Sequence, residues 1–203
     1  MNIALIGATG FVGSHLLAEA LRRGHTITAI ARHTNGIPQS SRVRPLKGDL
    51  ADEVGLTREL RGHDVVINAT KFIDADAARL LRIVRGAAVP RLLVVGGAGS
   101  LEVKPGLALV DTPDFPPEYK AEALAGRNFL NALRNEQVYN WTFLSPSAFL
   151  TPDEPTGKFR LGSDQLLVDE AGESRISVGD FAIALIDEVE QARHPRQRFT
   201  VGY

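Results

Sequence analysis

The chain has 203 residues, of which 44% are hydrophobic and 23% charged, and its formal net charge is −1. This length and composition are typical of one globular domain with a buried core. The near-zero net charge gives no reason to expect nucleic acid or an anionic membrane surface as a partner.

Residue types that are missing narrow the chemistry further. There is no cysteine, which excludes disulfides, thiolate catalysis and cysteine–metal sites. The five histidines show no H-x-x-x-H or H-E-x-x-H spacing, so we expect no bound metal. No apolar run approaches the roughly 20 residues that span a bilayer, and the first residues are typical of a strand rather than a charged leader. The sequence therefore predicts a cytoplasmic protein without membrane contact.

Over residues 1–144, short apolar runs alternate with amphipathic runs of helical period. This alternation predicts an α/β fold, namely a Rossmann-type, doubly wound, mainly parallel β-sheet with helices on both faces. The expected strands are residues 2–6, 25–31, 43–47, 64–68, 91–95 and 139–144. The expected helices are residues 11–23, 52–60, 74–85 and 118–135.

The alternation ends at Pro146, where a stretch rich in proline and glycine begins. Beyond it, the sequence predicts a helix at residues 178–192 and a last strand at 198–201. We predict a single domain over residues 1–203, with a small substrate-binding region at about 146–175. The alternative interpretation is that this region only covers the surface.

The first expected strand runs directly into a glycine-rich turn, residues 7–13, with the sequence GATGFVG. In such a strand–turn–helix unit, the first glycine permits the turn, the second lets a pyrophosphate approach, and the third lets helix pack on strand. Free N–H groups and the positive dipole end of the helix then favour phosphate. A purely structural turn is the alternative. The residues predicted here to contact a dinucleotide are Gly7, Thr9, Gly10, Phe11, Val12 and Gly13.

The end of the second expected strand distinguishes NAD from NADP. An acidic residue there binds the ribose hydroxyls, whereas an arginine pairs with a 2′-phosphate. This strand ends in Ala31-Arg32-His33, and no acidic residue follows until Asp49. Arg32 offers a planar fork to a phosphate, although it could also be a solvated loop residue. The sequence thus favours NADP(H) over NAD(H) as the cofactor.

The G-x-x-G-x-x-G spacing resembles that of the extended and atypical branch of the short-chain dehydrogenase/reductase superfamily. The resemblance implies that Asp49 hydrogen-bonds the adenine amino group and that Leu50 packs on the adenine ring. From the residues alone, Asp49 could equally cap a helix. The resemblance also implies that Ala69 and Thr70 line the cofactor ribose, in a variant of the Asn-Ala-Gly turn of reductases. Lys71 could reach a phosphate or a substrate carboxylate, or be an ordinary exposed lysine.

The same resemblance locates a reaction centre. It implies that Gly96 and Gly97, after the fifth strand, and Pro146, after the sixth, lie beside the cofactor, with Pro146 next to the nicotinamide. Ser100 stands where the superfamily has its catalytic serine. Tyr119, at the start of the next helix, is the candidate for the catalytic tyrosine.

The third part of the superfamily's catalytic set is missing. In the Tyr-x-x-x-Lys pair, a lysine one helical turn beyond the tyrosine lowers the tyrosine pKa. Position 123 is alanine here, and Lys120 lies about 100° away from Tyr119 around the helix axis. This departure argues against ordinary carbonyl reduction, and both Ser100 and Tyr119 could have structural roles instead.

Over essentially its whole length the chain resembles the small atypical reductases, which include biliverdin-IXβ/flavin reductases and bacterial NADH-flavin reductases. The resemblance implies an NADP(H)-dependent oxidoreductase that transfers hydride to a flat, conjugated acceptor such as a flavin or quinone, which can take its proton from water. The alternative is an NmrA-like dinucleotide-binding redox sensor without turnover. A sugar-nucleotide epimerase is disfavoured by the short chain and the absent Tyr-x-x-x-Lys pair. We expect a small aromatic or conjugated molecule as the partner, and a monomer or homodimer.

Overall fold

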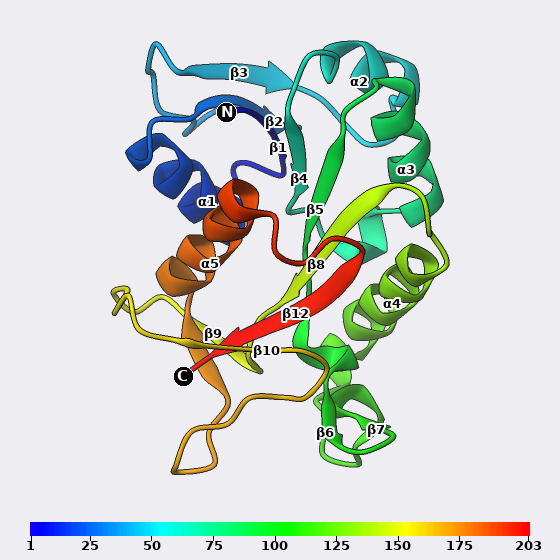
Figure 1. The fold of residues 1–203 in the computed structure, drawn as a ribbon, viewed down its shortest axis with the longest axis vertical. Coiled ribbons are helices and arrows are strands. Elements are labelled where there is room, and N and C mark those ends of the chain that lie inside the picture. The colour runs from blue at the N-terminus through cyan, green and yellow to red at the C-terminus, as the bar shows by residue number, and fades with distance from the viewer.

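The computed structural model describes residues 1–203, and one sheet of eight strands runs through it (Figure 1). In order across the sheet, the strands are β10 (Arg160–Gly162), β12 (Gln197–Gly202), β8 (Asn140–Ser145), β5 (Arg91–Val95), β4 (Val65–Asn68), β1 (Asn2–Ile6), β2 (Thr26–Ala31) and β3 (Val43–Lys47). All neighbouring strands are parallel except β10, which is antiparallel to β12. The strand order reverses between β1 and β4, which is where ligands bind in doubly wound sheets.

Helices cover both faces of the sheet (Figure 1). They are α1 (Phe11–Arg22), α2 (Glu53–Glu59), α3 (Ala77–Gly86), α4 (Pro117–Arg134) and α5 (Val178–Gln191). Side chains alternate along β1, so Ile3 and Leu5 pack beneath α1 and α5, whereas Ala4 and Ile6 pack beneath the other three helices. None of the helices has the length and apolarity that crossing a membrane requires. The predicted Rossmann-type, doubly wound fold is confirmed.

The helix predicted at 74–85 begins later than expected. Phe72–Asp74 forms a separate 3-10 helix, η1, and α3 begins only at Ala77. The side chain of Asp76 caps α3 by accepting a hydrogen bond from the Arg79 N–H at 2.6 Å. Helical periodicity therefore detected this helix but placed its first residue too early.

Several short elements were not predicted. After β5 the chain forms a 3-10 helix, a two-stranded hairpin and a second 3-10 helix, and after β8 a short strand pairs in parallel with the segment that precedes α5. These elements are η2 (Ala98–Ser100), β6 (Glu102–Lys104), β7 (Leu107–Ala108), η3 (Leu109–Asp111), β9 (Phe149–Thr151) and β11 (Arg175–Ser177). The only regular elements in the stretch at 146–175 are short strands.

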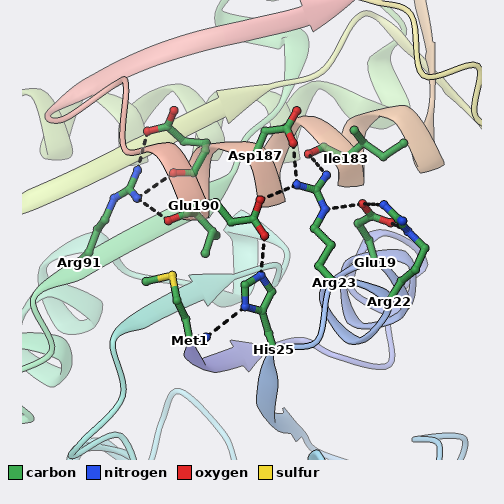
Figure 2. A network of polar contacts seen from close by, with 11 residues as sticks. Met1, Glu19, Arg22, Arg23, His25, Arg91, Ile183, Asp187 and Glu190 are labelled. Atoms are coloured by element: carbon green, nitrogen blue, oxygen red, sulfur yellow. Dashed lines mark hydrogen bonds and ion pairs between the residues drawn. The ribbon is translucent and has the colours of Figure 1, made fainter.

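A network of charged side chains fastens α5 to α1 (Figure 2). Arg23, directly after α1, donates to Glu19 at 2.7 Å and to Asp187 at 2.6 Å. It also donates to Glu190 at 2.8 Å, and Glu190 contacts Nε2 of His25 at 3.0 Å. The Arg23 side chain is only 14% exposed, whereas its partners Asp187 and Glu190 are 39% and 34% exposed. The helix that follows the glycine-rich turn is therefore held by the last helix of the chain.

A second ion pair ties β5 to the end of α5. Arg91 Nη2 donates to Glu188 Oε1 at 2.5 Å, and both side chains are buried. His194 Nδ1 contacts the other carboxylate oxygen at 2.7 Å, and the imidazole stacks on Phe199 with 4.0 Å between ring centroids. Burial lowers the pKa of Arg91, and the Glu188 carboxylate opposes that shift. These contacts fix the sheet against α5 at a second point.

Candidate cofactor site and active site

A cavity of about 340 Å³ lies at the carboxyl ends of β1, β2, β3 and β4. Its wall consists of residues at the ends of these strands and in the turns that follow them, where the strand order reverses. Most of the predicted cofactor residues line it, namely Gly7, Thr9, Gly10, Arg32, Asp49, Leu50, Ala69, Thr70 and Lys71. The other predicted cofactor residues are not part of its wall, namely Phe11, Val12, Gly13, Gly96, Gly97 and Pro146.

Two glycines of the first turn are required by close backbone approach. Gly7 has a φ of +87°, and a Cβ added to it would lie 2.7 Å from the carbonyl oxygen of Ala69. The Gly7 N–H donates to the carbonyl of Ile30 at 2.9 Å, which ties the turn to β2. A Cβ on Gly13 would lie 2.0 Å from the carbonyl oxygen of Gly7. Gly13 therefore lets α1 pack directly on the turn, whereas the sequence predicts that the third glycine lets the helix pack on the strand.

The amino end of α1 has free hydrogen-bond donors. Its N-cap residue, Gly10, has no side chain that could accept a bond, and the first turn contains no acidic residue. The N–H groups of Phe11 and Val12 have no acceptor within the chain. Free donors at the positive end of a helix stabilise a bound phosphate. This end of α1 fits the pyrophosphate of a dinucleotide.

Positive charge without an internal partner lies at the end of β2. Arg32 and His33 are both exposed on the cavity wall, and no carboxylate of the chain forms an ion pair with Arg32. No acidic residue occupies this position, so it offers no carboxylate to ribose hydroxyls. Arg32 is thus available to an anionic group of a ligand.

The turn after β3 presents one polar and one apolar side chain to the cavity. Asp49 Oδ1 accepts a hydrogen bond from the Ala51 N–H at 2.9 Å. Asp49 does not cap α2, because the N-cap is Asp52, which accepts from the Gly55 N–H at 2.9 Å. Leu50 is buried and also lines the cavity. The capping interpretation of Asp49 is therefore wrong, and the adenine-contact interpretation stays a prediction.

The turn after β4 is ordered by a residue that the sequence did not single out. Thr70 Oγ1 donates to Asn68 Oδ1 at 3.0 Å, while Asn68 Nδ2 is buried without a partner in the chain. The carboxylate of Glu122, on α4, accepts from the N–H groups of Phe72 and Ile73 at 2.6 and 3.0 Å. Glu122 thus holds the turn that contains Lys71, which is exposed and forms no ion pair.

The two predicted catalytic residues lie outside this cavity. Ser100 ends η2, and its Oγ accepts a hydrogen bond from Nη1 of Arg198 at 3.3 Å. Tyr119 lies in the first turn of α4, 63% exposed and without a hydrogen-bond partner for its hydroxyl. Arg198, on β12, was not predicted as a site residue. The only feature of the sequence that could have indicated a role for Arg198 is its charge within a short apolar strand.

Ala123, at the position of the superfamily's lysine, packs against Gly99. A Cβ added to Gly99 would lie 2.7 Å from the Cβ of Ala123, so α4 rests directly on η2. Neighbouring Lys120 is exposed at the start of α4. The structure brings no lysine ammonium to the Tyr119 hydroxyl. A cluster of His, Asp and Glu side chains that could hold a metal is also absent.

A buried carboxylate anchors the predicted substrate-binding region. Asp180, in the first turn of α5, accepts from the N–H groups of Thr156 and Gly157, each at 2.8 Å, and from the Tyr203 hydroxyl at 2.6 Å. Burial raises the pKa of Asp180, but these hydrogen bonds outweigh it and lower the pKa below its ordinary value. Asp180 therefore ties the loop around Thr156 to the α5 cap at Ser177.

Comparison with known proteins agrees with this site. Residues 7–189 match the family described as NAD(P)H-binding. The chain belongs to this NAD(P)H-binding family. The resemblance to the atypical branch of the short-chain dehydrogenase/reductase superfamily is thereby confirmed, and with it a place among NAD(P)H-binding oxidoreductases.

Three solved structures show the same fold over at least 96% of their length. One, from Burkholderia pseudomallei and provisionally called an exported protein, is 45% identical, with a TM-score of 0.90 and 100% of both chains covered. Another, from Bacteroides thetaiotaomicron and provisionally called an epimerase, is 42% identical, with a TM-score of 0.93 and 100% and 96% covered. A third, from Streptococcus pneumoniae and provisionally called an NADH-flavin reductase, is 35% identical, with a TM-score of 0.87 and 100% and 99% covered. These names differ from one another and do not indicate one acceptor. The acceptor of this protein must therefore be inferred from its own site.

Proposed function

We propose that the protein is an NADP(H)-dependent oxidoreductase that transfers hydride to a flat, conjugated acceptor such as a flavin or quinone. The choice of NADP(H) rests on Arg32, which lies on the cavity wall without an ion-pair partner. The end of β2, where Arg32 lies, has no acidic residue. The free N–H groups at the start of α1 support a pyrophosphate next to it. Together they suit a dinucleotide that carries a 2′-phosphate.

The choice of acceptor rests on exposed apolar side chains. Phe11, Ile73, Tyr119 and Phe149 are 50–68% exposed. They lie in segments that follow β1, β4, β5 and β8, whose carboxyl ends meet at one edge of the sheet. Large exposed apolar groups near such an edge favour a flat apolar ligand. A bound nicotinamide would supply the hydride. A conjugated acceptor can draw its proton from water, so the proposed reaction does not require Tyr119 as a proton donor.

One observation favours the alternative, a dinucleotide-binding sensor without turnover. The Tyr119 hydroxyl is exposed, has no hydrogen-bond partner and has no lysine one turn beyond it. Such a residue is a poor general acid. The absence of turnover with a well-bound cofactor would therefore favour the sensor. A cytoplasmic location, a single domain and a monomeric or homodimeric state remain predictions.

The test is anaerobic NADPH oxidation by purified protein with FMN, riboflavin and several quinones. Gly10 allows a matched pair of variants, because its backbone is extended and an added Cβ meets only the Gly7 carbonyl oxygen at 3.4 Å. Gly10→Asp places a negative charge at the pyrophosphate position, and Gly10→Asn has the same shape without the charge. We expect turnover with at least one acceptor and a far larger loss of NADPH affinity in the aspartate variant. Equal losses in the two variants, or no turnover by the parent protein, would contradict the proposal.

A further inference from the structure

Arg198 is a buried cation beneath the loop that follows β5. Only 2% of its side chain is exposed. Its neighbours Phe199 and Val201 belong to the core beneath α1 and α5, so by strand alternation Arg198 projects from the opposite face of the sheet, toward α4 and η2. A buried arginine is costly unless its donors are used, so its partners indicate its role.

The guanidinium contacts both the hydroxyl and the backbone of Ser100. Nη1 donates to Ser100 Oγ at 3.3 Å and to Ser145 Oγ at 3.4 Å, and Nη2 donates to the Ser100 carbonyl at 3.4 Å. Nε donates to Asp164 Oδ1 at 2.8 Å, and Nη2 also pairs with this carboxylate. Arg198 thus joins β12, β8 and η2 through one planar group.

The positive charge of Arg198 is only partly neutralised. Its carboxylate partner, Asp164, is 46% exposed and is shared with Arg134, which donates to it at 2.8 Å. Glu102 is the other carboxylate whose charge acts on Arg198. Burial lowers the pKa of the guanidinium, and Asp164 opposes that shift. A buried cation shared in this way leaves positive potential at the Ser100 hydroxyl.

The direction of the hydrogen bond determines what Ser100 can do. An arginine N–H can only donate, so Ser100 Oγ accepts from Arg198. No group in the chain accepts a hydrogen bond from the Ser100 hydroxyl. The hydroxyl proton is therefore free for a ligand, and a cation behind the oxygen makes the hydroxyl a stronger donor.

We propose that Arg198 is a positioning residue that acts through Ser100. Its positive charge replaces that of the missing lysine, but it acts on the Ser100 hydroxyl instead of on a tyrosine. Ser100 is then the residue that donates a hydrogen bond to the acceptor. This inference rests on the proposed function. When a ring atom of the acceptor gains the hydride from NADPH, the displaced electron pair moves to a conjugated carbonyl oxygen. Ser100 stabilises that oxygen by hydrogen bonding, and water supplies the proton. The acceptor class is therefore a ring with a conjugated carbonyl, such as a quinone or an isoalloxazine.

The variants needed for a test are compatible with the fold. Arg198→Met keeps an unbranched apolar stem and removes the guanidinium with its charge, and Asp164 keeps Arg134 as a partner. Ser145→Ala is the matched control for Ser100→Ala, because it removes a hydroxyl that contacts the same Nη1 atom at 3.4 Å instead of 3.3 Å. A merely structural role of Arg198 would make the two serine variants behave alike.

The experiment is a double-mutant cycle on anaerobic quinone reduction with NADPH. We expect Ser100→Ala and Arg198→Met each to lower kcat at least about tenfold, and the double variant to lower it no further, because Arg198 acts through Ser100. The dissociation constant of NADPH, measured by fluorescence, and the melting temperature of Ser100→Ala should stay close to those of the parent. Arg198→Lys should restore part of kcat, and Ser145→Ala should change it less than twofold.

A second readout does not depend on turnover. The phenolate of 4-nitrophenol mimics the charged oxygen, and its ionisation is followed by absorbance in the complex of protein and NADP⁺. We expect the parent protein to lower the apparent pKa of this probe, and Ser100→Ala or Arg198→Met to abolish the shift. Additive losses in the cycle, or no shift with the parent, would overturn the inference while the proposed function stands. An absence of NADPH oxidation by the parent protein would overturn both.

Discussion

Removing Arg32 should change cofactor selectivity more than cofactor binding in general. The guanidinium is exposed on the cavity wall and has no carboxylate partner, so Arg32→Ala breaks no ion pair or side-chain hydrogen bond within the protein. NADPH would lose a charge-assisted contact to its 2′-phosphate, whereas NADH has no group at that position. The variant should therefore fold as the parent does and bind NADH with unchanged affinity.

The size of the effect follows from the exposure of Arg32. Hydrogen bonds to charged groups contribute about 1.5–3 kcal/mol, and water and salt reduce this at an exposed site. We expect a loss of about 1–2 kcal/mol, which corresponds to roughly 5- to 30-fold weaker NADPH binding. Arg32→Lys, which keeps the charge but not the planar fork, should fall between parent and Arg32→Ala.

The assay is fluorescence titration of NADPH and NADH at low and high salt. The difference between the two cofactors should shrink with salt for the parent protein and be small throughout for Arg32→Ala. A parallel loss of affinity for NADPH and NADH would refute the assignment of Arg32 to the 2′-phosphate. In that case His33, the neighbouring side chain on this part of the wall, would be the next residue to replace.

Three further predictions test the framework of the site. Gly13→Ala should abolish NADPH binding in titration, because its Cβ would lie 2.0 Å from the Gly7 carbonyl oxygen, whereas neighbouring Ser14→Ala should bind normally. Arg23→Met should lower the free energy of unfolding in urea by about 2 kcal/mol, since it leaves three carboxylates without their shared partner; an unchanged value would contradict the network. The lowered pKa of Asp180 stabilises the fold above about pH 4, the ordinary pKa of aspartate, and this contribution is lost as the pH falls through the lower folded value. Asp180→Asn should therefore flatten the decline of the urea midpoint below about pH 4, and an unaltered slope would argue against this carboxylate.

The sequence was sufficient for the framework of the fold because the central strands are buried on both faces. Such strands appear as continuous apolar runs, and the runs at 2–6 and 91–95 agree with β1 and β5 to the residue. The predicted strand at 43–47 also agrees with β3, although β3 lies at the edge of the sheet and is mostly exposed. Helix starts were less secure. Periodicity does not register which aspartate caps a helix, so Asp52 and Asp76 were missed as the caps of α2 and α3.

In the candidate site, too, only residues with a local sequence signal could be predicted. The wall of the nucleotide cavity is built from local turns, so residues such as Gly7 and Thr70 could be chosen from their position after a strand. Glu122 and Arg198 act across the fold instead, on partners 50 and 98 residues away in the chain. Nothing in their immediate sequence neighbourhood indicates those partners. Their roles became visible only once the sheet had been assembled.

The pairing of α1 with α5 has a consequence for the newly made protein. On the ribosome, α1 emerges long before the carboxylate of Asp187, which lies 164 residues after Arg23. Until α5 has been synthesised and has docked, the part of the sheet face beneath α5 stays uncovered, and Arg23 lacks its carboxylate partners Asp187 and Glu190. The helix after the glycine-rich turn is thus made well before the helix that secures it. A nascent chain should therefore gain its full affinity for cofactor only when its final helix has left the exit tunnel.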